Sequence, residues 1–381
     1  MPFPGGHGNF GAVACGHSIP DFAIEHFWNT RRRQLSVYSN SENAIGRERH
    51  REMKYIVTLE EASALILSGK RLFVAGDESL LAALPRGQWI GGTIPYFMSE
   101  EGGLCTNAKI GVAPLPEFVT GAETRFYSID DLEKIPDGYK RNGFTRLILP
   151  AGTNIHQQFA RNCAHIPGIL GQPLIGWIAG VNLTDLGRIQ PKVFDGSTGK
   201  SSAEDAVAMH VELPETIVAK ANILNIFQRG AGDPILFLEE GFTATDCLVN
   251  GEKKNFAAYV KEKQIDTKLP LVAEYGGTRV NVSFQNVDEE QGIVSFYAPV
   301  FPGVEYKVAA PVEDYEAAFK RELSSGKAQA YFTCNCILNY MYGGLEGKHT
   351  GNVVGPITFG EIANMLLNQT MVYLTFESYA S

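Results

Sequence analysis

The chain has 381 residues, of which 44% are hydrophobic and 20% are charged, and its formal net charge at pH 7 is −9. This acidic balance excludes the broad basic surface by which many proteins bind nucleic acid or anionic lipid. No run of about 18 apolar residues is present, so the sequence contains no ordinary membrane-spanning helix. We therefore expect a soluble protein with a large core and with neither a nucleic-acid nor a membrane partner.

The six cysteines are sparse and, apart from Cys334 and Cys336, lie far apart in the sequence. This spacing does not indicate a disulfide framework. Reduced thiols are typical of the cytosol, and the first 20 residues contain no apolar signal core. The sequence therefore predicts a cytoplasmic protein.

Residues 1–52 show neither helical nor strand periodicity, in contrast to the chain that follows. We expect a poorly structured N-terminal extension there, and Met53 is a candidate for the true start. The folded body is expected to divide into two halves, residues 53–215 and 216–381.

The first patterned segment predicts a strand, a helix and a second strand. Residues 54–57 have the composition of a short strand, and Thr58 and Glu61 have the spacing of a capping box at a helix start. Gly69 is placed to end this helix, because glycine adopts the left-handed conformation that often follows a helix. Residues 71–75 then predict the next strand.

The middle of the chain contains short apolar or alternating runs bounded by Gly, Pro, Asn or Asp, which predict strands. These runs are residues 147–149, 174–178, 206–211, 223–227, 235–238, 280–284 and 293–297. Residues 313–323 predict a helix, and 328–334 a strand. The pattern indicates an α+β fold of two intimately packed halves, each a mixed β-sheet flanked by helices, with a binding cleft between them.

Near the C-terminus, Thr358 and Glu361 again have capping-box spacing, and Ile357 and Ile362 are placed as a hydrophobic staple. The sequence therefore predicts a helix beginning at residue 358, followed by a strand over 371–376. A capping role would explain Glu361 without any chemistry.

Cys334, Asn335 and Cys336 end the strand predicted before this helix. The two-residue period of a strand places both sulfurs on one face, where they could meet a metal, a haem or a reactive carbonyl. The alternative is that both cysteines are small buried hydrophobic residues. A structural zinc site would need four ligands, and no second cysteine pair exists.

Three other motifs have both a functional and a structural explanation. Gly91 and Gly92 follow a short apolar run, so they either allow a ligand to approach the backbone or form a tight turn. The segment 196–201 contains Gly-Lys-Ser, but Phe194 occupies the position at which a phosphate loop needs glycine. His156 and His210 could each ligate haem or act as a base, or be hydrogen-bonded structural residues.

The C-terminal stretch contains a cysteine at a strand end, a nearby glutamate, a Gly-x-x-x-x-Gly-Glu turn and a closing strand, at residues 332–336, Glu346, 355–361 and 368–370. In this order of features it resembles the end of the C-terminal domain of the FIST family. A similar order is visible at residues 72–76, 91–92 and 149–152. The resemblance implies a signal-input module that binds small ligands such as amino acids, and some haem-binding nitric oxide sensors also carry this domain.

These observations predict a cytoplasmic, small-ligand-binding sensory protein of the FIST type without a resident cofactor. One alternative is an enzyme with Cys334 or Cys336 as nucleophile and a distant histidine as base. The other is a haem-binding gas sensor. A signalling protein or a second copy of the chain is the expected macromolecular partner. The predicted ligand-binding residues are Gly91, Gly92, Thr93, Tyr96, Cys334, Asn335, Cys336, Asn339, Tyr342 and Glu361.

Overall fold

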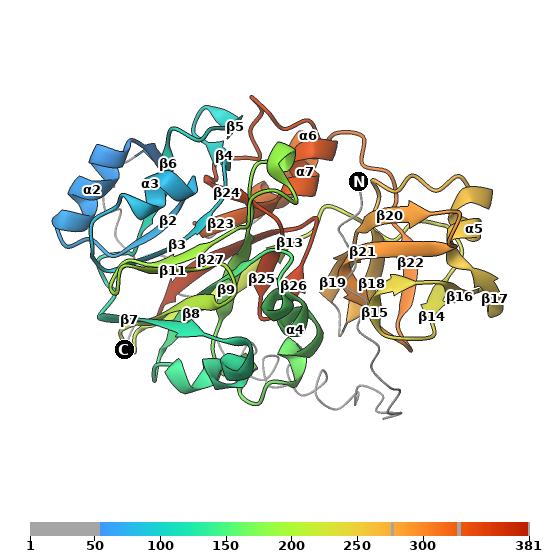
Figure 1. The fold of residues 1–381 in the computed structure, drawn as a ribbon, viewed down its shortest axis with the longest axis horizontal. Coiled ribbons are helices and arrows are strands. Elements are labelled where there is room, and N and C mark those ends of the chain that lie inside the picture. The colour runs from blue at the N-terminus through green and yellow to red at the C-terminus, as the bar shows by residue number, and fades with distance from the viewer. Residues whose placement is uncertain (1–53, 276–277, 326–328, 380–381) are drawn as a thin grey trace.

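The computed structural model describes residues 54–275, 278–325 and 329–379, and it confirms the predicted α+β class (Figure 1). The expected N-terminal extension and the candidate start at Met53 lie outside the described residues. Among the helices of the described ranges, none combines the length and hydropathy that a membrane-spanning helix requires.

The first sheet is formed mainly by the earliest strands of the described chain and is covered by two helices, α2 (Leu59–Leu67) and α3 (Glu78–Ala82). Its strands, in spatial order, are β1 (Ile56–Val57), β6 (Ile110–Pro114), β2 (Leu72–Gly76), β3 (Trp89–Thr93), β10 (Val193–Asp195) and β11 (Lys200–Ser202). The predicted capping box of α2 is confirmed, because the Thr58 and Glu61 side chains each accept the other residue's backbone N–H.

Two further six-stranded sheets form the centre of the molecule. The second sheet has the order β26 (Leu366–Leu367), β25 (Glu361–Ala363), β9 (Leu174–Ala179), β8 (Gly143–Pro150), β12 (Ala206–Glu212) and β7 (Gly121–Tyr127). The third has the order β13 (Ile217–Leu224), β27 (Met371–Ser378), β23 (Tyr331–Cys336), β24 (Gly355–Thr358), β4 (Tyr96–Ser99) and β5 (Gly102–Cys105).

Strands from both sides of residue 215 share these two sheets. β25 pairs with β9, and β24 pairs with β4, so the C-terminal segment 329–379 is built into sheets that begin near the N-terminus. The division expected at residue 215 is therefore not a division between sheets.

A smaller lobe of strands lies beside this body and appears in orange in Figure 1. One sheet has the order β17 (Glu252–Asn255), β16 (Asp246–Val249), β14 (Ile235–Phe237), β22 (Glu305–Val308), β18 (Leu271–Tyr275) and β19 (Thr278–Val282). The other has the order β15 (Gly241–Ala244), β21 (Ile293–Val300) and β20 (Phe284–Asp288). Phe237, Phe256 and Phe296 pack edge to face or tilted in its core.

Buried polar contacts join this lobe to the body. The Ser283 hydroxyl lies 2.6 Å from Asn368 Oδ1, and Asn281 Nδ2 donates to the Gln369 carbonyl at 3.0 Å. Asn368 and Gln369 form the turn between β26 and β27. The C-terminal segment thus contacts the small lobe at one end and the central sheets along its length.

The other helical elements lie between strands. They are the α-helices α4 (Asn154–Asn162), α5 (Phe256–Glu262), α6 (Tyr315–Ser325) and α7 (Ile337–Tyr342) and the 3₁₀ segments η1 (Ile129–Gly138), η2 (Cys163–His165), η3 (Ile169–Gly171) and η4 (Leu183–Asp185). The helix predicted over 313–323 is confirmed as α6.

The helix predicted to begin at residue 358 is wrong. β24 ends at Thr358 and β25 begins at Glu361, where the backbone pairs with Trp177 of β9. The Thr358 hydroxyl donates to the Gly360 carbonyl at 2.9 Å instead of accepting at a helix start. Pairing with a long-range strand partner has overridden a local capping pattern, which is a weak signal on its own.

Candidate functional site

The glycines expected to form a ligand-binding turn lie inside a strand. Gly91, Gly92 and Thr93 belong to β3, which pairs with β2 on one side and β10 on the other. A Cβ on Gly92 would lie 2.8 Å from the side chains of Ile148 and Trp177. The missing side chain therefore lets the first sheet pack closely on the second.

The residues predicted around the cysteine pair are brought together at the end of β23. Asn339 Nδ2 donates to Asn335 Oδ1 at 3.0 Å, and both side chains are buried. Burial raises the pKa of the Cys334 and Cys336 thiols, and the nearby Glu361 carboxyl raises each further. Both sulfurs therefore stay protonated near neutral pH, which disfavours either as a nucleophile.

Glu361 is fully buried within this cluster. One carboxyl oxygen accepts the Thr370 backbone N–H at 3.1 Å and the Thr370 hydroxyl at 2.8 Å, whereas the other has no hydrogen-bond partner among the described residues. Burial raises the pKa of Glu361 to about 8. The carboxyl is therefore mostly protonated at pH 7.

The two aromatic residues of the predicted site lie at its edge. The Tyr96 ring is 5.7 Å from that of Tyr340, which follows Asn339 in α7, so β4 lies beside α7. Tyr342 ends α7 and is partly buried. A large cavity is lined by residues that include Thr333, the sequence neighbour of Cys334. None of the predicted ligand-binding residues lines it.

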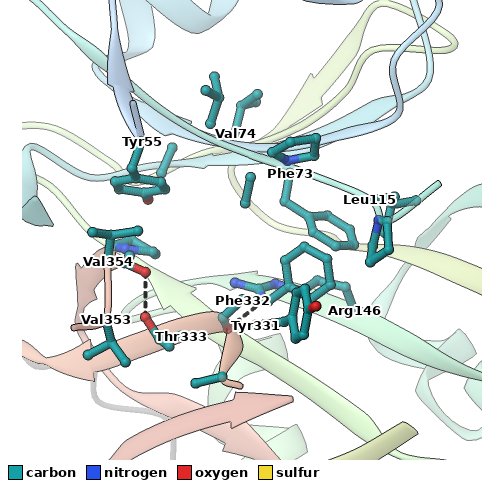
Figure 2. Close-up of a pocket in the computed structure, with 18 of the residues that line it drawn as sticks. Tyr55, Phe73, Val74, Leu115, Arg146, Tyr331, Phe332, Thr333, Val353 and Val354 are labelled. Atoms are coloured by element: carbon teal, nitrogen blue, oxygen red, sulfur yellow. Dashed lines mark hydrogen bonds between the residues drawn. The ribbon is translucent and has the colours of Figure 1, made fainter. Parts of the chain in front are cut away.

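That cavity has a volume of about 640 Å³ and lies where the three six-stranded sheets of the body meet (Figure 2). Phe73 of β2, Arg146 of β8, Trp177 of β9 and Phe332 of β23 each contribute to its wall. Most of the remaining lining is aliphatic or proline. Lys70 and Glu117, which form an exposed ion pair at 3.0 Å, also line it, so the cavity opens to solvent on their side.

Arg146 is the charged group held deepest in this cavity. Its side chain is only 2% exposed, and its Nη1 donates to the Phe332 carbonyl at 3.0 Å. The guanidinium carbon lies 5.0 Å from the centre of the Phe73 ring and 5.8 Å from that of Phe332. Its Nε is buried and has no hydrogen-bond partner among the described residues.

Among the described residues, no carboxylate compensates the charge of Arg146. Burial lowers the pKa of Arg146, and the described ionisable groups that also act on it are Cys334 and Tyr55. An arginine nevertheless remains protonated at any ordinary pH. The cavity therefore contains a permanent positive charge in mainly apolar surroundings.

The wall opposite Phe73 is shaped by an irregular strand. The register between β23 and β27 shifts between Tyr331 and Cys334, and Phe332 has a φ of 52°, in the left-handed region. Bulges of this kind redirect side chains and are frequent beside functional sites. Here the bulge points the Phe332 ring at Phe73, with the ring centroids 4.9 Å apart, and its carbonyl at Arg146 (Figure 2).

Sequence analysis did not identify Arg146, Tyr55 or Phe332 as site residues. For Arg146 a signal exists, because it is a charged residue within the buried apolar strand Gly143–Pro150. A charge at such a position is rare unless it has a partner or a function. The bulge at Phe332 has no comparable signature in the sequence.

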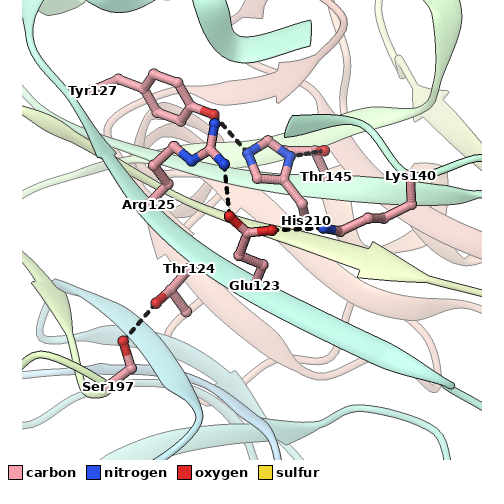
Figure 3. Close-up of polar contacts among 8 residues, drawn as sticks. All are labelled: Glu123, Thr124, Arg125, Tyr127, Lys140, Thr145, Ser197 and His210. Carbon is pink, nitrogen blue, oxygen red and sulfur yellow. Dashed lines mark hydrogen bonds and ion pairs between the residues drawn. The ribbon is translucent and has the colours of Figure 1, made fainter. Parts of the chain in front are cut away.

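Of the two histidines considered as haem ligands or bases, His210 is fully buried and His156 is partly buried. His210 uses both ring nitrogens, with Nε2 2.7 Å from the Tyr127 hydroxyl and Nδ1 2.8 Å from that of Thr145 (Figure 3). His156 Nδ1 accepts the Gly152 N–H at 3.3 Å. Burial lowers the pKa of each to about 4. In the described part of the chain, no group of three His, Cys, Asp or Glu side chains is placed to hold a metal ion.

Comparison with known proteins gives a family but no characterised relative. No curated protein and no solved structure matches the chain. One family model, described as a family of unknown function (DUF6976), matches residues 57–377, which covers all three sheets of the body and the small lobe. The chain therefore belongs to the DUF6976 family.

Proposed function

We propose that this protein binds a small molecule in the Arg146 cavity and acts as a cytoplasmic signal-input protein. The observation that carries the proposal is the cavity itself. Its volume of about 640 Å³ falls within the range of small-molecule sites. A mainly apolar lining with a few polar groups is also typical of such sites.

Binding is favoured over catalysis by the residues that line the cavity. No cysteine or histidine is among the described lining residues, and the Cys334–Cys336 pair lies outside it with protonated thiols. A nucleophile with an adjacent base is therefore not assembled there. The FIST-type sensory role stays a prediction from the sequence.

A signal-input role is supported by the way the cavity joins distant segments. Its walls include β2 near the N-terminus and the C-terminal strands β23 and β24. The same C-terminal segment contacts the small lobe through Asn368 and Gln369. A ligand that binds one arrangement of these segments more tightly would shift the population toward it.

The proposal can be tested by filling the cavity. Val354 is a partly buried lining residue on the loop before β24, and Val354→Trp would place an indole in the cavity. Val287→Trp, at a partly buried position of β20 in the small lobe, is the matched control. We expect mass spectrometry to find a small molecule co-purifying with the wild type and the control but not with Val354→Trp. Equal retention by both variants would contradict the proposal.

A further inference from the structure

We infer that the ligand is a monocarboxylate with an apolar body, whose carboxylate is held by Arg146. This inference rests on the proposed function, since it assumes that the cavity binds a small molecule. It is drawn from the unpaired hydrogen-bonding edge of the guanidinium, the single positive charge in the deep part of the cavity and the aromatic walls around it.

Burial of the Arg146 charge is energetically costly. A charge removed from water is strongly unfavourable unless it is paired or hydrogen-bonded. Arg146 has one recorded hydrogen bond, to the Phe332 carbonyl, and its Nε is buried without an acceptor. A negatively charged oxygen in the cavity would satisfy this donor and compensate the charge at the same time.

The geometry of the Arg146 guanidinium matches that of a carboxylate. A guanidinium donates in its own plane, and Nε with one terminal nitrogen matches the two oxygens of a carboxylate. The aromatic rings of Phe73 and Phe332 lie 5.0 and 5.8 Å from the guanidinium carbon and restrict its position. Nη1 is already bound to the Phe332 carbonyl, and Nε, which solvent does not reach, becomes available to a ligand carboxylate when the surrounding wall shifts.

Tyr55 supplies a second donor. It lines the cavity, and Arg146 is near enough for its charge to affect the pKa of the Tyr55 hydroxyl. Burial raises that pKa, so the hydroxyl keeps its proton and can donate to a carboxylate oxygen.

The charges that line the cavity match a ligand with a single negative charge. Lys70 is the other cationic residue of the described lining, but it is half exposed and paired with Glu117. One deep guanidinium matches one negative charge, whereas a phosphate dianion would leave an uncompensated charge in an apolar site. Glu117 is the one acidic side chain in the described lining, and because it is already paired at the opening, the ammonium group of an amino acid has no deep partner.

The test is isothermal titration of the full-length protein with matched probes. 3-Phenylpropanoate contains the carboxylate and an aromatic body, 3-phenylpropanamide replaces the charge by a neutral group, phenylalanine adds an ammonium, and inorganic phosphate removes the apolar body. We expect the acid to bind at least about tenfold more tightly than each of the other three, as is reasonable for one charge-assisted bidentate contact.

Two variants locate the selectivity. Arg146→Met removes the charge and preserves an apolar side chain of comparable length, and it should lower the affinity for the acid to that for the amide. Arg146→Lys keeps the charge without the planar fork and should fall between the two. Lys70→Met, at the opening, is the control and should keep the acid preference. If Arg146→Met does not fold, the ratio of acid to amide on the unmodified protein still decides the question.

The outcomes separate this inference from the proposed function. Binding of the amide as tightly as the acid, or an acid preference that persists in folded Arg146→Met, overturns the carboxylate assignment and leaves a binding cavity. Tighter binding of phosphate or phenylalanine overturns it in the same way. If none of the probes binds and no small molecule co-purifies with the protein, both the inference and the proposed function fail.

Discussion

The Nη1 group of Arg146 donates a hydrogen bond to the backbone carbonyl of Phe332, 186 residues further along the chain. This contact joins the central strand β8 to the bulge in β23, which belongs to the neighbouring sheet. It fixes the guanidinium between two aromatic rings while its Nε stays unpaired. The arrangement is unfavourable for a structural residue and suitable for a ligand-binding one.

We predict that Arg146 does not stabilise the ligand-free protein. Arg146→Met removes a buried, uncompensated charge, a gain that should offset the lost hydrogen bond to Phe332. The free energy of unfolding of the variant, measured by urea denaturation without ligand, should equal or exceed that of the wild type. A loss of more than about 3 kcal/mol, the size expected on breaking a buried ion pair, would mean that the charge is already compensated within the protein.

The sequence predicted part of the secondary structure, namely the elements that local patterns specify. The capping box at Thr58 and Glu61 and the helix α6 are examples. The same local pattern failed at Thr358, where pairing of β25 with β9 decides the conformation. Sequence patterns do not specify which distant strands pair.

The candidate site depends on such distant pairings, and this explains why the sequence did not predict it. Phe73, Arg146 and Phe332 come from three different sheets, and Tyr55 directly precedes β1. These residues meet only after the sheets have packed. The part of the cysteine cluster from Cys334 to Tyr342 was predicted because it lies within one strand and the helix that follows it. The assignment of a ligand to that cluster and to β3 stays a prediction.

Because of Glu361, we expect the free energy of unfolding to fall as the pH rises. Its pKa is about 8 in the folded protein and 4.5 by reference, so folding is favoured by its protonated form. This contribution is fully present below pH 4.5 and is lost as the pH rises through 8. Glu361→Gln, which is neutral at every pH, should flatten the dependence of the free energy of unfolding between pH 4.5 and about 8. An unchanged slope in the variant would show that the carboxyl ionises normally in the fold.

Because of His210, we expect the free energy of unfolding to fall as the pH is lowered. Its pKa falls from 6.5 to about 4 on burial, so only the unfolded chain takes up a proton between these values. The contribution is fully present above pH 6.5 and is lost as the pH falls through 4. His210→Gln should reduce the slope of the free energy of unfolding in this window, whereas the exposed His165→Gln should not. Equal slopes in the two variants would contradict the assignment. The partly buried His156 contributes in the same direction in both variants.

We expect the missing side chain of Gly92 to be required for the close packing of the first two sheets. In Gly92→Ala the new Cβ would lie 2.8 Å from Ile148 and Trp177, so the first two sheets must shift apart. We expect a loss of about 1–3 kcal/mol in the free energy of unfolding, the usual size for an overpacked core. Gly232→Ala, where no atom lies within 4 Å of the added carbon, is the control and should be nearly neutral. If the two variants are equally stable, the close packing at Gly92 is not required.

Calorimetric titration of 3-phenylpropanoate into the wild type and Val354→Trp tests whether a small molecule binds in the cavity beside Arg146. The two proteins should have similar melting temperatures, since Val354 lies on a loop and is only partly buried. We expect one site in the wild type and at least about a tenfold loss of affinity in the variant, because the indole occupies the same space. Equal affinity in both proteins would place the ligand outside this cavity.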